Sequence, residues 1–176
     1  MNEYQRRSEL GRFGEIVVCE QLTKNGRQNC THIGGINRCF DAEAYESGQK
    51  HLFAVKTRNH TTDKNELKKD CYNLFYNKTK GGDPYAEVRI ALGIAHSQNA
   101  IPMWAAVTVD ARQQKYTIYY GRVADLPDKR YIPMSPSDRL RHHKLAEDVY
   151  DPRIDPNWSN VKRKPSGLGE DRLLLP

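Results

Sequence analysis

The stretch FDAEAYESGQKHLFAVKTR, at residues 40–58, constrains the fold more than any other part of the chain. It holds two runs of β-prone residues, 40–45 and 51–57, joined by a segment with a Ser-Gly turn signal. Side chains alternate between the faces of a strand, so an antiparallel hairpin can place the acidic face that includes Asp41 beside the face that includes Lys56. An acid cluster beside a lysine on a rigid support is what metal-assisted phosphodiester hydrolysis needs.

These residues carry a resemblance to a known family. An aspartate that opens one strand, followed by Val-Lys-Thr-Arg at the end of the next, resembles the core of the PD-(D/E)XK nuclease superfamily. The segment LGRFGE at 10–15 opens a predicted helix and extends the match to the Holliday-junction-resolvase-like branch, in which a glutamate of the first helix accompanies the strand acids. The resemblance spans roughly residues 8–58. It implies an α/β, restriction-endonuclease-like fold, a mixed β-sheet flanked by helices.

The activity that the resemblance implies is Mg²⁺-dependent endonucleolytic hydrolysis of DNA, in restriction, recombination or repair. Its catalytic residues here would be Asp41, Lys56 and Glu15, with Lys56 positioning or activating the attacking water. The metal ligands would be Asp41, Glu15 and the main-chain carbonyl of Val55, oxygen donors that suit Mg²⁺, with Mn²⁺ as a substitute. The implied substrate is duplex or branched DNA, and cutting both strands would call for a homodimer.

Position 54 departs from the family pattern, which has an acid two residues before the lysine where this chain has Ala54. Three explanations stay open. In the first, Ala54 stands where an engineered change replaced a glutamate in order to hold substrate without cutting it. In the second, Glu43, on the same strand face as Asp41, supplies the missing metal ligand. In the third, the site is inactive and the protein is a binding module. Loss of a metal-ligating carboxylate predicts poor cutting in all three cases.

Residues expected to contact nucleic acid follow from the same resemblance and from the basic composition. The formal net charge is +6, which is consistent with a polyanionic partner or with an ordinary lysine-rich surface. The resemblance favours nucleic acid and places Thr57 and Arg58 at the neighbouring phosphate. Further basic residues lie on two predicted helices, and they are Lys68, Lys69, Arg139 and Arg141.

The remaining composition places the protein among soluble chains. Charged residues make up 28% of the sequence and hydrophobic residues 38%, and no apolar run approaches the roughly 18 residues that a membrane span needs. The N-terminus lacks the apolar core of a signal peptide, so a cytoplasmic location is expected. Cys30, His32 and Cys39 are spaced poorly for a closed zinc site, so we expect reduced thiols instead.

Periodicity and turn signals predict the order of the elements. A helix begins at a Ser8 cap and ends near Gly26, and a short strand covers 31–33. The later predictions are a helix over 65–77, a strand over 85–96, strands over 103–109 and 115–120, and a helix over 137–149. Frequent prolines after Gly121 predict an irregular C-terminal extension, so the chain divides into a nuclease-like core, 1–126, and a basic, proline-rich extension, 127–176.

Two other classes of function compete with the nuclease. A non-catalytic nucleic-acid-binding protein would keep the fold and the basic surface. A structural or interaction protein would use Lys56 as an ordinary sheet lysine and Asp41 as a strand-end cap. Both alternatives, like the nuclease, depend on how close the side chains of these two residues lie.

Overall fold

The computed structural model describes residues 3–34, 38–60, 70–75, 81–151 and 153. This part of the chain is an α/β structure built on a mixed six-stranded sheet. Its elements in chain order are α1 (Glu3–Lys24), β1 (Gln28–His32), β2 (Ala42–Glu46), β3 (Gln49–Asn59), β4 (Cys71–Asn73), α3 (Ala86–Ser97), β5 (Ala100–Asp110), β6 (Lys115–Arg122), the short 3₁₀ turn η1 (Val123–Asp125), β7 (Tyr131–Pro133), α4 (Pro136–Arg141) and β8 (His143–Val149).

The strands of the main sheet follow the order β1-β2-β3-β5-β6-β8. The pair β3 and β5 is parallel, and the other four neighbouring pairs are antiparallel. The predicted hairpin is confirmed as β2 and β3, joined at Ser47 and Gly48, whose positive φ angles of 50° and 78° suit a two-residue hairpin turn. A separate small sheet pairs β4 with β7.

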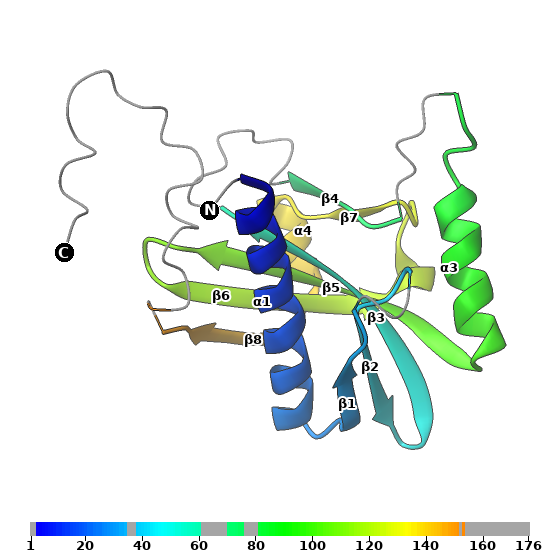
Figure 1. Cartoon of the computed structure of the whole chain (residues 1–176), viewed down its shortest axis with the longest axis horizontal. Helices are drawn as coiled ribbons and strands as arrows, with labels where there is room; N and C mark the ends of the chain where they lie inside the picture. The colour runs from blue at the N-terminus through cyan, green and yellow to red at the C-terminus, as the bar shows by residue number, and fades with distance from the viewer. Residues whose placement is uncertain (1–2, 35–37, 61–69, 76–80, 152, 154–176) are drawn as a thin grey trace.

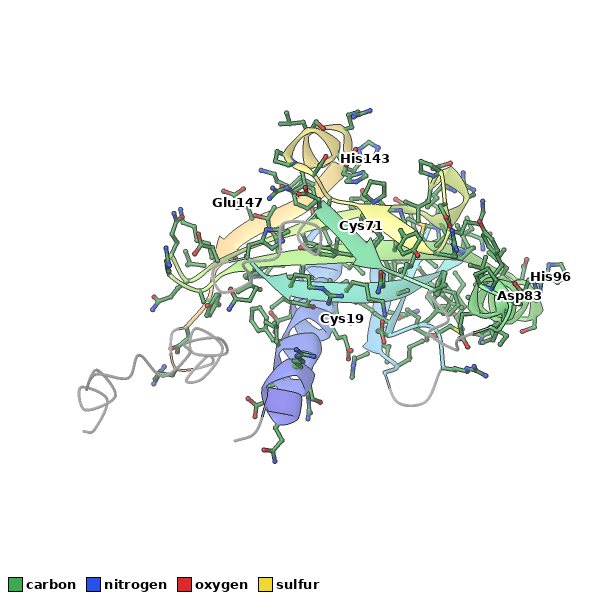
Figure 2. All side chains as sticks on the ribbon, turned by 90° about the horizontal axis from the view of Figure 1, so that it is seen from above. Cys19, Cys71, Asp83, His96, His143 and Glu147 are labelled. Carbon is green, nitrogen blue, oxygen red and sulfur yellow. The ribbon has the colours of Figure 1, made fainter. Side chains whose placement is uncertain are left out.

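Each face of the main sheet covers its own hydrophobic core. On one face, α1 buries Phe13, Val17, Val18 and Leu22 against alternate residues of β2, β3, β5 and β6. On the other face, α3 and the β4–β7 pair pack on the intervening residues, among them Trp104. Figure 2 shows α1, with Cys19, on one side of the sheet and β4, with Cys71, on the other. Such alternation of buried side chains requires a sheet that is covered on both faces.

The first helix is confirmed, but it begins at Glu3, so Ser8 lies inside it instead of capping it. Its buried face includes Val18, which is fully buried, whereas Ile16, two positions earlier, is 40% exposed. The helix crosses the sheet in Figure 1 and packs mainly against β3 and β1.

Three secondary-structure predictions are wrong. Residues 86–97 form a helix, α3, where a strand was expected, because a short apolar run does not distinguish a strand from a buried helix. Residues 71–73 form strand β4, not part of a helix over 65–77, and residues 61–69 and 76–80 lie outside the described part. The helix expected over 137–149 stops at Arg141, after which β8 begins.

The extension after residue 126 was expected to be irregular, and this is wrong for 131–149. There β7, α4 and β8 form, and β8 pairs with β6 at the edge of the main sheet. Ser135, not Ser137, caps α4, in a reciprocal capping box with Asp138. The division into 1–126 and 127–176 itself stays a prediction. In the described part of the chain, no helix is both long and apolar enough to cross a membrane.

Candidate active site at the end of strand β2

Asp41 lies at the start of β2, where the regular pairing of β2 with β3 ends at Ala42 and Phe53. Its main chain is held on both sides. The Asp41 N–H donates to the Phe53 carbonyl at 2.8 Å, and its carbonyl accepts from the Ile33 N–H at 2.8 Å. Its side chain then takes the place of a main-chain acceptor from the next strand position, because Oδ2 accepts a hydrogen bond from the Val55 N–H at 2.7 Å. This bond fixes the Asp41 carboxylate at the rim of the sheet.

Lys56 and Ala54 follow on β3 and share the face that packs against α3. Ala54 is fully buried, with Trp104 as its neighbour on β5. Lys56 is only half-buried and pairs with Ala106. Asp41 and Lys56 lie at the same end of the hairpin, close enough for the charge of Lys56 to act on Asp41. Position 54, in contrast, is fully buried among apolar residues.

Charges around Asp41 compete in setting its protonation. Burial raises the pKa of the Asp41 carboxyl, and this is the largest influence. The positive charge of Lys56 and the hydrogen bond from Val55 lower the pKa, and the negative charge of Glu15 raises it. The pKa lies above its usual value, so the ionised carboxylate is held at a cost in free energy that a nearby cation would reduce.

Glu15 reaches this rim from α1 because the helix lies very close to β3. Gly14 makes the approach possible, since a Cβ at this position would lie 1.9 Å from Thr57 Oγ1. Glu15 Oε2 then contacts Nε2 of His32, at the end of β1, at 2.5 Å. Four charged or titratable side chains therefore lie near the start of β2: Glu15, His32, Asp41 and Lys56.

His32 is a site residue that the sequence did not identify. It was considered only as a poorly spaced zinc ligand, because its contact with Glu15 depends on the rotation of α1 and on the register of β1 with β2. Gly34 completes the arrangement, since a Cβ there would lie 2.6 Å from His32 Nε2 and 2.8 Å from Glu15 Oε2.

Glu43, the expected substitute for the missing acid, does not join these residues. It lies opposite Leu52 on β3, and its carboxylate pairs with Lys50 Nζ at 2.9 Å. Lys50 in turn donates to Gln98 Oε1 at 2.9 Å. Glu43 is two residues from Asp41, about 7 Å along the strand, but its carboxylate is engaged by Lys50. The structure therefore gives no support to Glu43 as a ligand beside Asp41.

The two residues expected at the neighbouring phosphate differ in access. Thr57 is buried under Gly14, and its hydroxyl has no exposed surface and no hydrogen-bond partner within the described part of the chain. The expected phosphate contact of this side chain therefore does not fit. Arg58 is half-buried on the opposite face, with its guanidinium 5.4 Å from the centre of the Tyr72 ring. Lys68 and Lys69 lie outside the described residues.

Arg139 and Arg141 are on α4, on the same sheet face as Lys56. His142, which follows α4, packs against Trp104 at 4.8 Å and Tyr119 at 6.4 Å between ring centres. Trp104 pairs with Ala54 and Tyr119 pairs with Ala106, so the end of α4 lies over β5 and β6, beside the strand that carries Lys56. Arg141 pairs with Asp138 of the same helix.

The donor set at the rim fits a weakly held Mg²⁺ better than a closed metal site. Among the described residues, no group of three or more histidine, cysteine and acidic side chains is arranged to hold a metal ion. Mg²⁺, however, keeps several waters and is commonly bound by one or two carboxylates together with substrate phosphates. Asp41 and Glu15 are carboxylates of that kind.

Comparisons with known proteins add no relative: no family model, no curated protein and no solved structure matches this chain.

Proposed function

We propose that the chain has the restriction-endonuclease-like fold of the PD-(D/E)XK superfamily and is a Mg²⁺-dependent DNA endonuclease whose cutting is weak because of Ala54. The observation that carries this proposal is the rim of the sheet. There Asp41 is fixed by the Val55 N–H, Lys56 acts on it through its charge, and Glu15 approaches from α1. A mixed sheet with a helix on each face is the architecture that the resemblance implies.

Each residue at the rim would have a distinct task. Asp41 and Glu15, with the Val55 carbonyl, would hold Mg²⁺, which when bound neutralises phosphate charge and lowers the pKa of a bound water. Lys56 would orient the attacking water and offset negative charge on the phosphate. The hydrogen bond from Val55 keeps the Asp41 side chain in one orientation, so little ordering is needed when substrate arrives. Cutting both strands would use a homodimer.

A second candidate function is binding of nucleic acid without cutting. The observation that favours it is the closed position 54, where a fully buried alanine stands beside Trp104 in place of a ligand. The net charge of +6 and the half-buried Lys56 and Arg58 are compatible with either function.

The experiment that separates the two functions is the substitution Ala54→Glu, with Ala54→Gln as a control of equal volume without the charge. The measurement is Mg²⁺-dependent cleavage of plasmid and branched DNA, with thermal unfolding recorded because position 54 is buried. We expect cleavage to rise with glutamate and not with glutamine. Added to Ala54→Glu, the change Lys56→Ala should abolish cutting and reduce DNA affinity only modestly.

Other outcomes decide against the nuclease. A folded Ala54→Glu protein that binds DNA but cuts no better supports the binding protein. If Ala54→Glu does not fold, the original sequence at high concentration serves instead, and its weak cutting should disappear with Lys56→Ala. Both functions predict DNA binding whose affinity falls steeply as salt concentration rises, since phosphate contacts release counterions. If no such binding is measured, both functions are excluded.

A further inference from the structure

The contact between Glu15 and His32 is exposed enough to contribute little to stability. The side chain of His32 is 35% exposed and that of Glu15 is 22% exposed. Ion pairs that water can reach stabilise a fold only slightly. A different role for this pair is suggested by where it lies, because it joins α1 to β1 beside the Asp41 carboxylate.

His32 is attached to the same stretch of main chain that holds Asp41. It pairs with Ala42 across β1 and β2, and the next residue, Ile33, donates its N–H to the Asp41 carbonyl at 2.8 Å. A glutamate side chain has three rotatable bonds, and its carboxylate has no fixed place unless something holds it. Through its Nε2 contact, His32 ties the Glu15 carboxylate to the strand end that carries Asp41.

Gly34 gives independent support for the contact between His32 and Glu15, because the lack of a side chain at residue 34 leaves room for it. A Cβ on residue 34 would lie within 2.8 Å of both the Glu15 carboxylate and the His32 ring. Such separations are far below van der Waals contact, so any larger residue would displace one of the two side chains. The φ angle of Gly34 is not among the positive ones, so the backbone conformation alone does not require glycine.

We infer that His32 is a positioning residue, which holds Glu15 in the place where it binds a divalent cation together with Asp41. The inference rests on the proposed function and deepens it, because it adds a residue supporting the metal ligands. Groups that orient metal ligands typically change metal affinity by about 10- to 100-fold when they are removed.

The test measures Mn²⁺ affinity by electron paramagnetic resonance of the free ion, so that it does not depend on cutting. The variants are His32→Ala, Glu15→Gln, their double variant and Asp41→Asn. We expect His32→Ala to weaken Mn²⁺ binding by about tenfold or more. The double variant should bind no more weakly than Glu15→Gln alone, because His32 acts through Glu15.

Two further variants separate positioning from a merely structural role. His32→Gln keeps a nitrogen that can donate to Glu15 and should restore part of the affinity. Gly34→Ala leaves both side chains present and should weaken Mn²⁺ binding in the same direction as His32→Ala. Lys144→Ala removes another exposed ion pair, with Glu147 at 2.8 Å on β8, and should leave Mn²⁺ affinity unchanged. Unfolding temperatures should stay close to that of the original protein for His32→Ala and His32→Gln.

The outcomes distinguish a failure of this inference from a failure of the proposed function on which it rests. If Asp41→Asn weakens Mn²⁺ binding and His32→Ala does not, the positioning role is wrong and the proposed metal site stands. Additive losses in the double variant would also overturn the inference, since His32 would then act without Glu15. If neither Asp41→Asn nor His32→Ala changes Mn²⁺ affinity, the inference and the proposed function fail together.

Discussion

At the scale of single residues, Asp41 combines two tasks that have opposite energetic consequences. Its carboxylate satisfies the Val55 N–H, which stabilises the end of the hairpin. Burial raises its pKa above the usual value, so the ionised form is disfavoured in the folded protein. If Asp41 served only to cap the end of the strand, a neutral side chain that accepts the same hydrogen bond would stabilise the protein equally well. The stability of such a variant can be measured.

We expect Asp41→Asn to be at least as stable as the original protein at pH 7, because the amide oxygen still accepts from Val55 and the buried charge is gone. An acid whose pKa is raised by folding costs stability above that pKa, and the cost disappears below the unfolded value of about 3.9. The advantage of the asparagine variant should therefore shrink as pH falls from 7 toward 4. Thermal unfolding across this range measures it.

The control for this prediction is Asp41→Ala, which removes the acceptor as well as the charge. Leaving the Val55 N–H without its partner should cost about 1–3 kcal/mol relative to asparagine. If Asp41→Asn were markedly less stable than the original at pH 7, and DNA cutting and Mn²⁺ binding were unaffected, Asp41 would be a structural cap and nothing more.

Sequence reasoning found part of the site at this scale. Alternation along a hairpin predicts that the face with Asp41 lies beside the face with Lys56, and the register of β2 with β3 brings the two residues to one end of the hairpin. The contact between Glu15 and His32 could not be derived, because it depends on how α1 is rotated over the sheet. The burial of Thr57 was missed for the same reason, since it lies under Gly14.

At the scale of elements, the packing of α1 on β3 decides where Glu15 lies. Two glycines of this helix, Gly11 and Gly14, could each allow a close approach to the sheet. Only Gly14 has this role, because a Cβ on Gly11 would meet none of the described residues within 4 Å. The helix therefore has one tight point against the sheet, directly before the residue that enters the site.

We expect Gly14→Ala to destabilise the protein by about 1–3 kcal/mol, because the added Cβ would overlap the buried Thr57 hydroxyl. The matched control, Gly11→Ala, should instead stabilise the helix by about 1 kcal/mol, because alanine is the better helix former. Chemical denaturation of the two variants compares them directly. A similar gain in stability from both changes would mean that α1 does not approach β3 this closely.

The elements that sequence reasoning misassigned have a common cause. The apolar residues of α3 fit a strand as well as a helix, and its burial on one side against Trp104 and the neighbouring core settles the choice only in three dimensions. The prediction of a helix over 137–149 was wrong because the residues of β8 are mostly exposed and show no clear alternation. Edge strands of this kind are formed by pairing with a neighbour, here β6, more than by their own pattern.

At the scale of the whole molecule, residues beyond 126 contribute to both cores. Ile132 and Met134 are fully buried with the β4–β7 side of the sheet. Tyr150 is buried on the α1 side, where its ring lies 5.3 Å from that of Phe13. The main sheet therefore depends on chain that the sequence assigned to an extension.

We expect a chain ending at residue 126 to lose cooperative unfolding, because it lacks β7, α4, β8 and Tyr150. A chain ending at Arg153 retains every described element and should unfold in one transition. Circular dichroism during heating distinguishes the two. Cooperative unfolding of the 1–126 chain at an unchanged temperature would support the division of the protein at that point.

The parallel pairing of β3 with β5 also has a consequence for how the protein folds. Lys50 lies beside Ala100, so these neighbours are fifty residues apart in the sequence, whereas β2 and β3 meet through a turn of two residues. Closing the longer loop costs more chain entropy before any contact is gained, and such distant pairings slow the rate-limiting step. The hairpin that carries Asp41 and Lys56 can therefore form early, but the sheet that supports it is completed only when β5 docks.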